Sequence, residues 1–162
     1  MTRPVFMMLV GLPGSGKSTF RADPAYRYYV HLSTDDFIDM QAQVHDLTYD
    51  EAFSMYVDDA ARVLQKTLTM ALSAKDNIIW DQTNLSLKKR RGILSQLPKL
   101  YHKEAVYFEI DEGLRQQRLL SRPGKTIPRQ IDASMRASYV RPSLGEGFNA
   151  VFSYTEKGVV TV

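Results

Sequence analysis

Eight consecutive residues near the start of the chain have the types and spacing that hold the phosphates of a nucleotide. Gly11, Gly16, Lys17 and Ser18 satisfy the pattern G-x-x-x-x-G-K-[ST], in which glycines let backbone amides turn toward phosphate oxygens. The lysine neutralises the β and γ phosphates, and the hydroxyl after it binds Mg²⁺. An ordinary glycine-rich turn explains the match less well, because it lies between a buried-strand pattern and a helix start.

This loop predicts a binding site for ATP and Mg²⁺. The residues expected to contact the nucleotide are Gly11, Pro13, Gly14, Ser15, Gly16, Lys17, Ser18 and Thr19. Lys17 is expected to act in catalysis as well as in binding, and Ser18 is the expected metal ligand. The loop alone does not decide between ATP and other nucleoside triphosphates, nor what happens to the nucleotide.

A pair of acids follows the second predicted strand, where a kinase needs a carboxylate to take the proton of the acceptor hydroxyl. Asp35 and Asp36 come just after residues 28–32, at the carboxyl edge of the predicted sheet. We expect Asp35 to be the general base and Asp36 to stabilise the next helix or support the site. The alternative is that both acids only stabilise the helix N-terminus through its dipole.

A second polar segment ends the strand predicted over residues 78–80. Asp81 closes this strand, and Thr83 and Asn84 follow it. We expect these side chains to hold the acceptor, and Asp81 to assist the metal or keep Asp35 in place. A turn-forming role for Asp81 is the alternative.

Three arginines fall on one face of a predicted helix. Arg115, Arg118 and Arg122 lie at i, i+3 and i+7 and would repel one another unless an anion lay between them. They predict a lid around residues 112–128 that closes over the transferring phosphates. Arg122, beside the turn Pro123-Gly124-Lys125, is the expected catalytic lid residue, and Arg118 is expected to bind the nucleotide. For Arg115 a solvated helix face is the open alternative.

Strands alternating with helices position these residues and predict an α/β fold with three layers, a central parallel sheet and helices on both faces. The expected strands cover residues 5–10, 28–32, 78–80, 103–110 and 150–154. Helices are expected over residues 17–22, 36–43, 48–74, 86–97, 111–122 and from 128 to before 142. An apolar stripe from Phe53 to Leu72 is expected to pack on the sheet.

Length and composition fit one globular domain spanning residues 1–162. The absence of cysteine excludes disulfides and thiolate metal sites and is compatible with a reducing cytosol. No apolar run predicts a signal peptide or a membrane span, so we expect a cytoplasmic protein, in the host cell if it is phage-encoded. The oligomeric state stays open.

With these motifs in order, nearly the whole chain resembles the kinase domain of phage polynucleotide 5′-kinases. The resemblance implies that Asp35 is the general base, that Asp81, Thr83 and Asn84 support the acceptor, and that Arg122 meets the phosphates. That family has an arginine three residues after the catalytic Asp, which contacts a phosphate of the nucleic acid, and Ile38 stands at this place. The related phage 5-hydroxymethyluridine DNA kinases use similar machinery on a base hydroxyl.

The acceptor implied by this resemblance is a hydroxyl of DNA or RNA, either at a 5′ end or on a hydroxymethylated base. The basic run Lys88 to Arg91 could follow a nucleic-acid backbone, although a solvated helix face explains it better. A kinase for a small nucleoside, sugar or antibiotic is the first alternative, because the same loop and carboxylate serve any hydroxyl. A GTPase-type or nucleotide-sensing module is the second.

Overall fold

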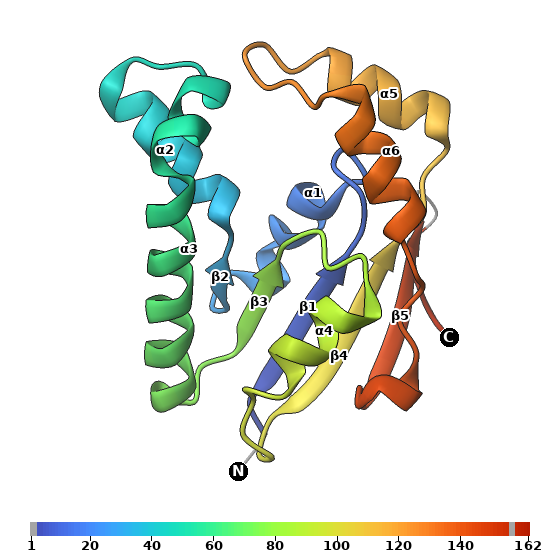
Figure 1. Cartoon of the computed structure of the whole chain (residues 1–162). Helices are drawn as coiled ribbons and strands as arrows, with labels where there is room; N and C mark the ends of the chain where they lie inside the picture. The colour runs from blue at the N-terminus through green and yellow to red at the C-terminus, as the bar shows by residue number, and fades with distance from the viewer. Residues whose placement is uncertain (1–2, 156–157) are drawn as a thin grey trace.

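A six-stranded sheet forms the centre of the molecule, with the strand order β2-β3-β1-β4-β5-β6 (Figure 1). The computed structural model describes residues 3–155 and 158–162. Its strands are β1 (Val5–Val10), β2 (Val30–Leu32), β3 (Ile78–Asp81), β4 (His102–Phe108), β5 (Ala150–Thr155) and β6 (Gly158–Thr161). The helices are α1 (Lys17–Arg21), α2 (Thr34–His45), α3 (Tyr49–Ala74), α4 (Leu87–Leu94), α5 (Glu112–Leu120) and α6 (Arg129–Ser138).

The central strand β1 is buried, because other elements cover both faces of the sheet there. Successive side chains of a strand point to opposite sides, so those of β1 alternate between two core clusters. Phe6, Met8 and Val10 pack with residues of α3 and α4 on one face. Met7 and Leu9 pack on the other face with Phe20 of α1 and nearby tyrosines. The three-layer α/β prediction is therefore confirmed, with a thinner layer on the α1 side.

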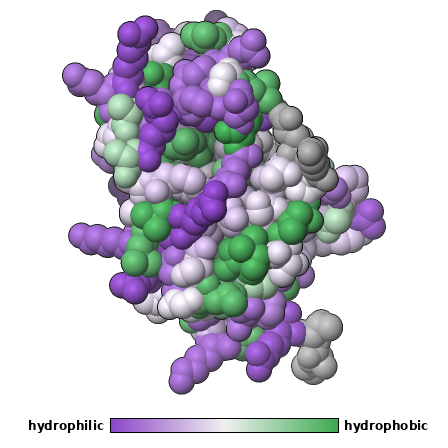
Figure 2. All heavy atoms as spheres, turned by 90° about the vertical axis from the view of Figure 1, so that its right-hand side faces the viewer, coloured by the Kyte–Doolittle hydropathy of each residue, from purple (hydrophilic) through white to green (hydrophobic). Residues whose placement is uncertain are grey.

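The last strand adds an antiparallel edge to the predicted parallel sheet. Strands β1 to β5 pair in parallel, but β6 runs antiparallel to β5, so the sheet is mixed. Val159 and Val160 on this edge strand are exposed. In the view onto this side, hydrophilic side chains gather at the upper and lower ends of the face, and hydrophobic groups lie mainly between them (Figure 2).

The long helix α3 begins where the sequence predicts. Thr48 and Glu51 form a reciprocal capping box at its start. Its apolar stripe is only partly core, because Phe53 and Val57 are exposed while Leu68 is fully buried. The first turns of α3 pack on α2 through Ile38 and Ala52 instead of reaching the sheet. In the described residues, no helix has the length and apolar character needed to cross a membrane.

Candidate active site

A cavity of about 830 Å³ lies at the carboxyl edge of the parallel strands. This is the edge where open α/β sheets bind their ligands. Its lining brings together residues from the phosphate loop, α1, the start of α2, the end of β3 and the segment after α5. They are Pro13, Gly14, Gly16, Lys17, Ser18, Thr19, Arg21, Ser33, Thr34, Asp35, Asp36, Asp39, Tyr49, Asp81, Gln82, Thr83, Arg118, Ser121, Arg122, Pro123 and Lys125.

The phosphate loop has the backbone that its glycines predict. Gly14 and Gly16 adopt φ values of +84° and +103°, a region that L side chains rarely occupy. A Cβ atom on Gly14 would also lie 3.3 Å from Cγ of Arg115, and one on Gly11 would lie 2.6 Å from Oγ of Ser15. The loop thus keeps an open concave backbone at the N-terminus of α1, which suits phosphate oxygens.

Lys17 lies within this loop, and its ammonium group donates hydrogen bonds to the carbonyl oxygens of Gly11 (2.9 Å) and Leu12 (3.2 Å). Burial lowers the pKa of Lys17 to about 8, although the nearby carboxylates of Asp81 and Asp35 favour its charged form. A half-buried ammonium whose hydrogen-bond partners among the described residues are carbonyl oxygens is poised to gain an anionic partner. This arrangement fits the predicted contact with nucleotide phosphates.

Asp35 stands across the cavity in the first turn of α2. Its Oδ1 accepts a hydrogen bond from the Tyr49 hydroxyl (2.6 Å), and its Oδ2 pairs with the Lys125 ammonium (2.9 Å). Burial works to raise the pKa of Asp35, but Lys125, Tyr49 and Lys17 outweigh it and hold the pKa below its usual value. Asp35 is therefore ionised at neutral pH, as a general base requires.

Asp36 and Asp81 are joined by an arginine of α1. Arg21 forms a two-pronged contact with the Asp36 carboxylate, and its Nε lies 2.9 Å from Oδ2 of Asp81. Burial raises the pKa of Asp81, while Lys17 and Arg21 counteract the shift. The ends of α1, α2 and β3 are thus held together by one guanidinium group, and Asp36 has the supporting place expected for it.

Thr83 and Asn84, which follow β3, lie in different surroundings. Thr83 lines the cavity, and its carbonyl accepts a hydrogen bond from the Gly11 amide (3.0 Å). Asn84 is fully buried, donates to the Leu9 carbonyl (2.7 Å) and accepts from the Trp80 indole (3.1 Å). The expectation that Asn84 binds the acceptor is therefore wrong for its side chain, whose polar atoms bind the ends of β1 and β3.

The three arginines expected on one face of a helix are placed differently. Arg115 is fully buried, and its guanidinium binds Glu112, Asp132 and the Pro13 carbonyl. It faces neither solvent nor the cavity, so both of its expected roles are wrong. The reason is that α6 supplies Asp132 within reach of Arg115, a contact that helix spacing does not reveal.

Arg118 and Arg122 do line the cavity. Arg118 Nη1 lies 3.4 Å from the Gly14 carbonyl oxygen, beside the phosphate loop. Arg122 lies beyond the last residue of α5, Leu120, in the loop that leads to α6. The predicted helix was therefore too long, and Arg122 reaches the cavity from a loop that crosses above the site. We call residues 121–128 the crossing loop.

A smaller cavity adjoins the other side of the phosphate loop. It has a volume of about 320 Å³ and is lined by Ser15, Gly16, Thr19, Glu109, Ile110, Arg118, Tyr154 and Thr155. Arg118 borders both cavities. A nucleotide with its phosphates in the larger cavity would have room here for its nucleoside part. Ser15 and Thr19, expected to contact the nucleotide, both lie at this side.

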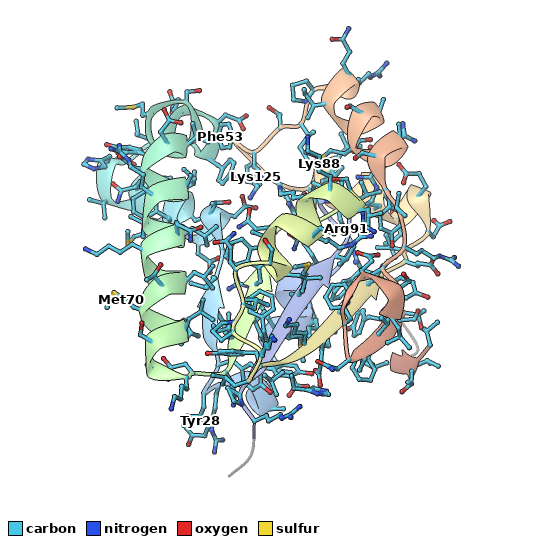
Figure 3. The ribbon with its side chains drawn as sticks, turned by 60° about the horizontal axis from the view of Figure 1, so that its bottom comes forward. Tyr28, Phe53, Met70, Lys88, Arg91 and Lys125 are labelled. Atoms are coloured by element: carbon cyan, nitrogen blue, oxygen red, sulfur yellow. The ribbon has the colours of Figure 1, made fainter. Side chains whose placement is uncertain are left out.

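The basic run on α4 is not a continuous charged face. Arg90 is fully buried, pairs with Glu146 (2.7 Å) and donates to the carbonyl oxygens of Asn84, Leu85 and Val140. Lys88 and Arg91 remain exposed on α4 (Figure 3). Arg90 therefore joins α4 to Val140 and Glu146, and its buried guanidinium is not part of the exposed basic surface.

The oxygen groups needed for Mg²⁺ are present beside the phosphate loop. Ser18 and Asp81 both line the cavity and offer a hydroxyl and a carboxylate, the hard ligands that Mg²⁺ prefers. Within the described residues no group of three or more His, Cys, Asp and Glu side chains could hold a metal alone. The donor set fits a metal ion that is shared with nucleotide phosphates.

Arg21, Tyr49 and Lys125 are among the cavity residues that the sequence analysis did not identify as functional groups. Arg21 lies four residues after Lys17, one helical turn further along α1, so its spacing was a usable signal. Lys125 lies in the segment Pro123-Gly124-Lys125, for which the sequence predicted only a turn. Tyr49 carries no signal, because it reaches the site only through the packing of α3 on α2.

The mostly parallel sheet, the phosphate loop and the facing carboxylates define the P-loop kinase fold. A family model described as an AAA domain matches residues 6–142. The chain belongs to this family, because the match covers well over half of its length. The fold class predicted from the sequence is thereby confirmed.

Several solved structures have a similar fold. A chain in the structure of the Pnkp1/Rnl/Hen1 RNA repair complex is 25% identical, with a TM-score of 0.65 over 85% of this chain and 44% of that one. The present chain therefore spans less than half of that protein. A chain of the PezAT toxin–antitoxin system of Streptococcus pneumoniae is 16% identical, with a TM-score of 0.67 over 99% of this chain and 71% of that one.

A gluconokinase from Sinorhizobium meliloti is 15% identical, with a TM-score of 0.55 over 94% of this chain and 84% of that one. These last two likenesses concern the fold alone. Together with the family match, these neighbours establish the fold of the chain.

Proposed function

We propose that this protein is an ATP-dependent kinase that transfers the γ-phosphoryl group to a hydroxyl of a nucleic acid. The observation that carries the reaction type is that one cavity contains both Lys17 in the phosphate loop and the ionised carboxylate of Asp35 across from it. A phosphate site and a base facing each other leave a place between them for the acceptor oxygen.

The residues divide the chemistry between them. The loop amides and Lys17 hold the phosphates, and Arg118, beside the loop, and Arg122, on the crossing loop, add positive charge near them. Bound Mg²⁺, held by Ser18 with Asp81 nearby, would supply positive charge at the phosphate oxygens. The acceptor oxygen forms a bond to the γ phosphorus as the bond to the bridging oxygen breaks and ADP leaves. Asp35 takes the proton of the acceptor hydroxyl.

The nucleic-acid acceptor rests on likeness. The chain resembles polynucleotide kinases in the order of its motifs, and a protein of an RNA repair complex is 25% identical to it. Both a 5′-hydroxyl end and the hydroxymethyl group of a modified base fit the proposal, since either presents a primary hydroxyl.

One observation favours a second candidate, a kinase for a small acceptor such as a nucleoside, a sugar or an antibiotic. Ile38, which stands where the polynucleotide kinases have a phosphate-binding arginine, is buried between α2 and α3. The exposed residue beside it on the cavity is Asp39, another acid. Repulsion between such a wall and nucleic-acid phosphates would disfavour a long polyanion.

A panel of acceptors with ATP labelled at the γ position separates these candidates. The panel contains a 5′-hydroxyl oligonucleotide, an end-blocked DNA with hydroxymethylated bases, and a set of nucleosides, sugars and aminoglycosides. We expect label on one of the nucleic acids. Label only on a small molecule would replace the proposal with the second candidate.

The matched control is Asp35→Asn, which keeps the size of the side chain and removes its basicity. This variant should bind ATP with unchanged affinity by calorimetry and transfer label at least about a hundredfold more slowly. Transfer by Asp35→Asn at the wild-type rate would exclude Asp35 as the base. Wild-type protein that binds ATP but labels no acceptor of the panel would contradict the proposed kinase activity.

A further inference from the structure

The crossing loop is tied to the first turn of α3 on the acceptor side of the cavity. Asp50 accepts hydrogen bonds from the Thr126 amide (3.1 Å to each carboxylate oxygen) and from the Thr126 hydroxyl (2.6 Å). The Asp50 amide donates to the Gly124 carbonyl oxygen (3.0 Å). One carboxylate and one amide thus fasten the loop at two successive peptide units.

The fit between the loop and α3 is close. Gly124 adopts a φ of +70°, and a Cβ atom there would lie 3.1 Å from Cβ of Thr48, the N-cap of α3. Only glycine combines this backbone conformation with so short an approach. The capping box of α3 therefore also forms the surface on which the loop lies.

The fastened loop carries Lys125 to the catalytic carboxylate. The Lys125 ammonium lies 2.9 Å from Oδ2 of Asp35 and 3.7 Å from the centre of the Tyr49 ring. Tyr49 in turn donates to Oδ1 of Asp35 (2.6 Å). Lys125 lies on the loop that faces α3 (Figure 3). Each carboxylate oxygen keeps a second lone pair, so an acceptor hydroxyl can still donate to Asp35.

We propose that Asp50, Lys125 and Tyr49 are positioning residues for phosphoryl transfer: Asp50 anchors the crossing loop so that Lys125, with Tyr49, holds the Asp35 carboxylate in its orientation. This inference rests on the proposed role of Asp35 as the base. The same loop carries Arg122, so the anchor on Asp50 also sets how the loop reaches the phosphate side. Asp50 thereby links the position of Asp35 on the acceptor side to that of Arg122 on the phosphate side.

The charges around Asp35 explain why this support matters. Titratable groups that interact with it come from several elements of the described structure: Lys17 and Arg21 of α1, Asp39 of α2, Tyr49 of α3, Asp81 of β3 and Lys125 of the crossing loop. Asp36 of α2 and Arg122 of the crossing loop line the same cavity. The surrounding carboxylates and burial oppose the ionised form. Among the causes that lower the pKa of Asp35, Lys125 is the largest.

The first test is the pH dependence of transfer, measured as kcat and KM for wild type, Lys125→Met, Lys125→Arg and Tyr49→Phe. Loss of an opposite charge within hydrogen-bond distance raises a carboxyl pKa by about one unit or more. We expect the acid limb of the kcat profile to move to higher pH by about that amount in Lys125→Met. Tyr49→Phe should move it in the same direction by less, and Lys125→Arg should restore the wild-type position.

Asp50→Ala should reproduce the shift of Lys125→Met without altering a residue that touches Asp35. Asp58→Ala, on the exposed face of the same helix, and Lys66→Met are the matched controls and should leave the profile unchanged. A Lys125→Met or Asp50→Ala profile that falls in height but keeps the wild-type acid limb would overturn the inference, because a purely structural loop would behave in that way.

A carboxyl carbon NMR titration of Asp35 keeps this inference separate from the identity of the acceptor. The Asp35 resonance, assigned by its absence in Asp35→Asn, should titrate at higher pH in Lys125→Met than in wild type. An unchanged titration would overturn the inference even if transfer is observed. A shifted titration in a protein that phosphorylates no acceptor would instead contradict the proposed function.

Discussion

Arg115 and Asp132 form a buried, two-pronged ion pair that joins α5 to α6. Arg115 Nη1 and Nη2 donate to Oδ1 and Oδ2 of Asp132, both at 2.9 Å. The same guanidinium binds the Pro13 carbonyl of the phosphate loop (3.2 Å). A residue expected to bind phosphate thus holds the phosphate loop against the two helices that flank the crossing loop.

Removal of one partner of this pair should destabilise the protein strongly. Among the described residues, Asp132→Ala leaves the buried guanidinium with Glu112 as its one charged partner. We expect a loss of about 3 kcal/mol in the free energy of unfolding. Urea denaturation measures it. The double variant Arg115→Met, Asp132→Leu should recover most of the loss, since it buries no unpaired charge. A loss below about 0.5 kcal/mol in Asp132→Ala would contradict a structural role for the pair.

Nucleotide affinity should depend on the charge of Lys17. The pKa of Lys17 is lowered to about 8, so its ammonium loses a proton as the pH rises through that value. Because phosphates prefer the charged form, the Kd for ATP should increase by about tenfold per pH unit above the pKa. Calorimetry at increasing pH measures this.

Lys17→Arg is the control for that titration, because a guanidinium stays charged over the whole range. Its affinity for ATP should be nearly independent of pH, whatever its absolute value. An equally steep pH dependence in this variant would assign the effect to another group.

Arg122 should act mainly on the transition state. A loop guanidinium that meets the transferring group stabilises charge that develops during the reaction. Arg122→Ala should therefore lower kcat by about a hundredfold or more while raising the KM for ATP only a few times. Steady-state kinetics with ATP in excess and at limiting concentration separates the two effects. Weaker ATP binding with an unchanged kcat would place Arg122 in ground-state binding alone.

The sequence by itself determined the elements whose signals are local. The loop Gly11 to Ser18 follows a buried strand and begins a helix, as predicted, because glycine freedom and the charges of Lys17 act over a few residues. The capping box at Thr48 could likewise be predicted, because it depends on two residues three positions apart. The carboxylates that follow β2 and end β3 could be placed together, because parallel strands have their carboxyl ends at one edge of the sheet.

Only the tertiary structure determined which charged side chains form ion pairs. Arg115 and Arg90 looked like exposed cations, but Asp132 and Glu146 neutralise them from 17 and 56 residues away. The pairing of Lys125 with Asp35 spans 90 residues. Such partners leave no periodic signal, because a long side chain reaches whatever carboxylate the packing of helices brings near it. The strands could be predicted from local patterns, whereas the support of the catalytic carboxylate depends on how α2, α3 and the crossing loop pack.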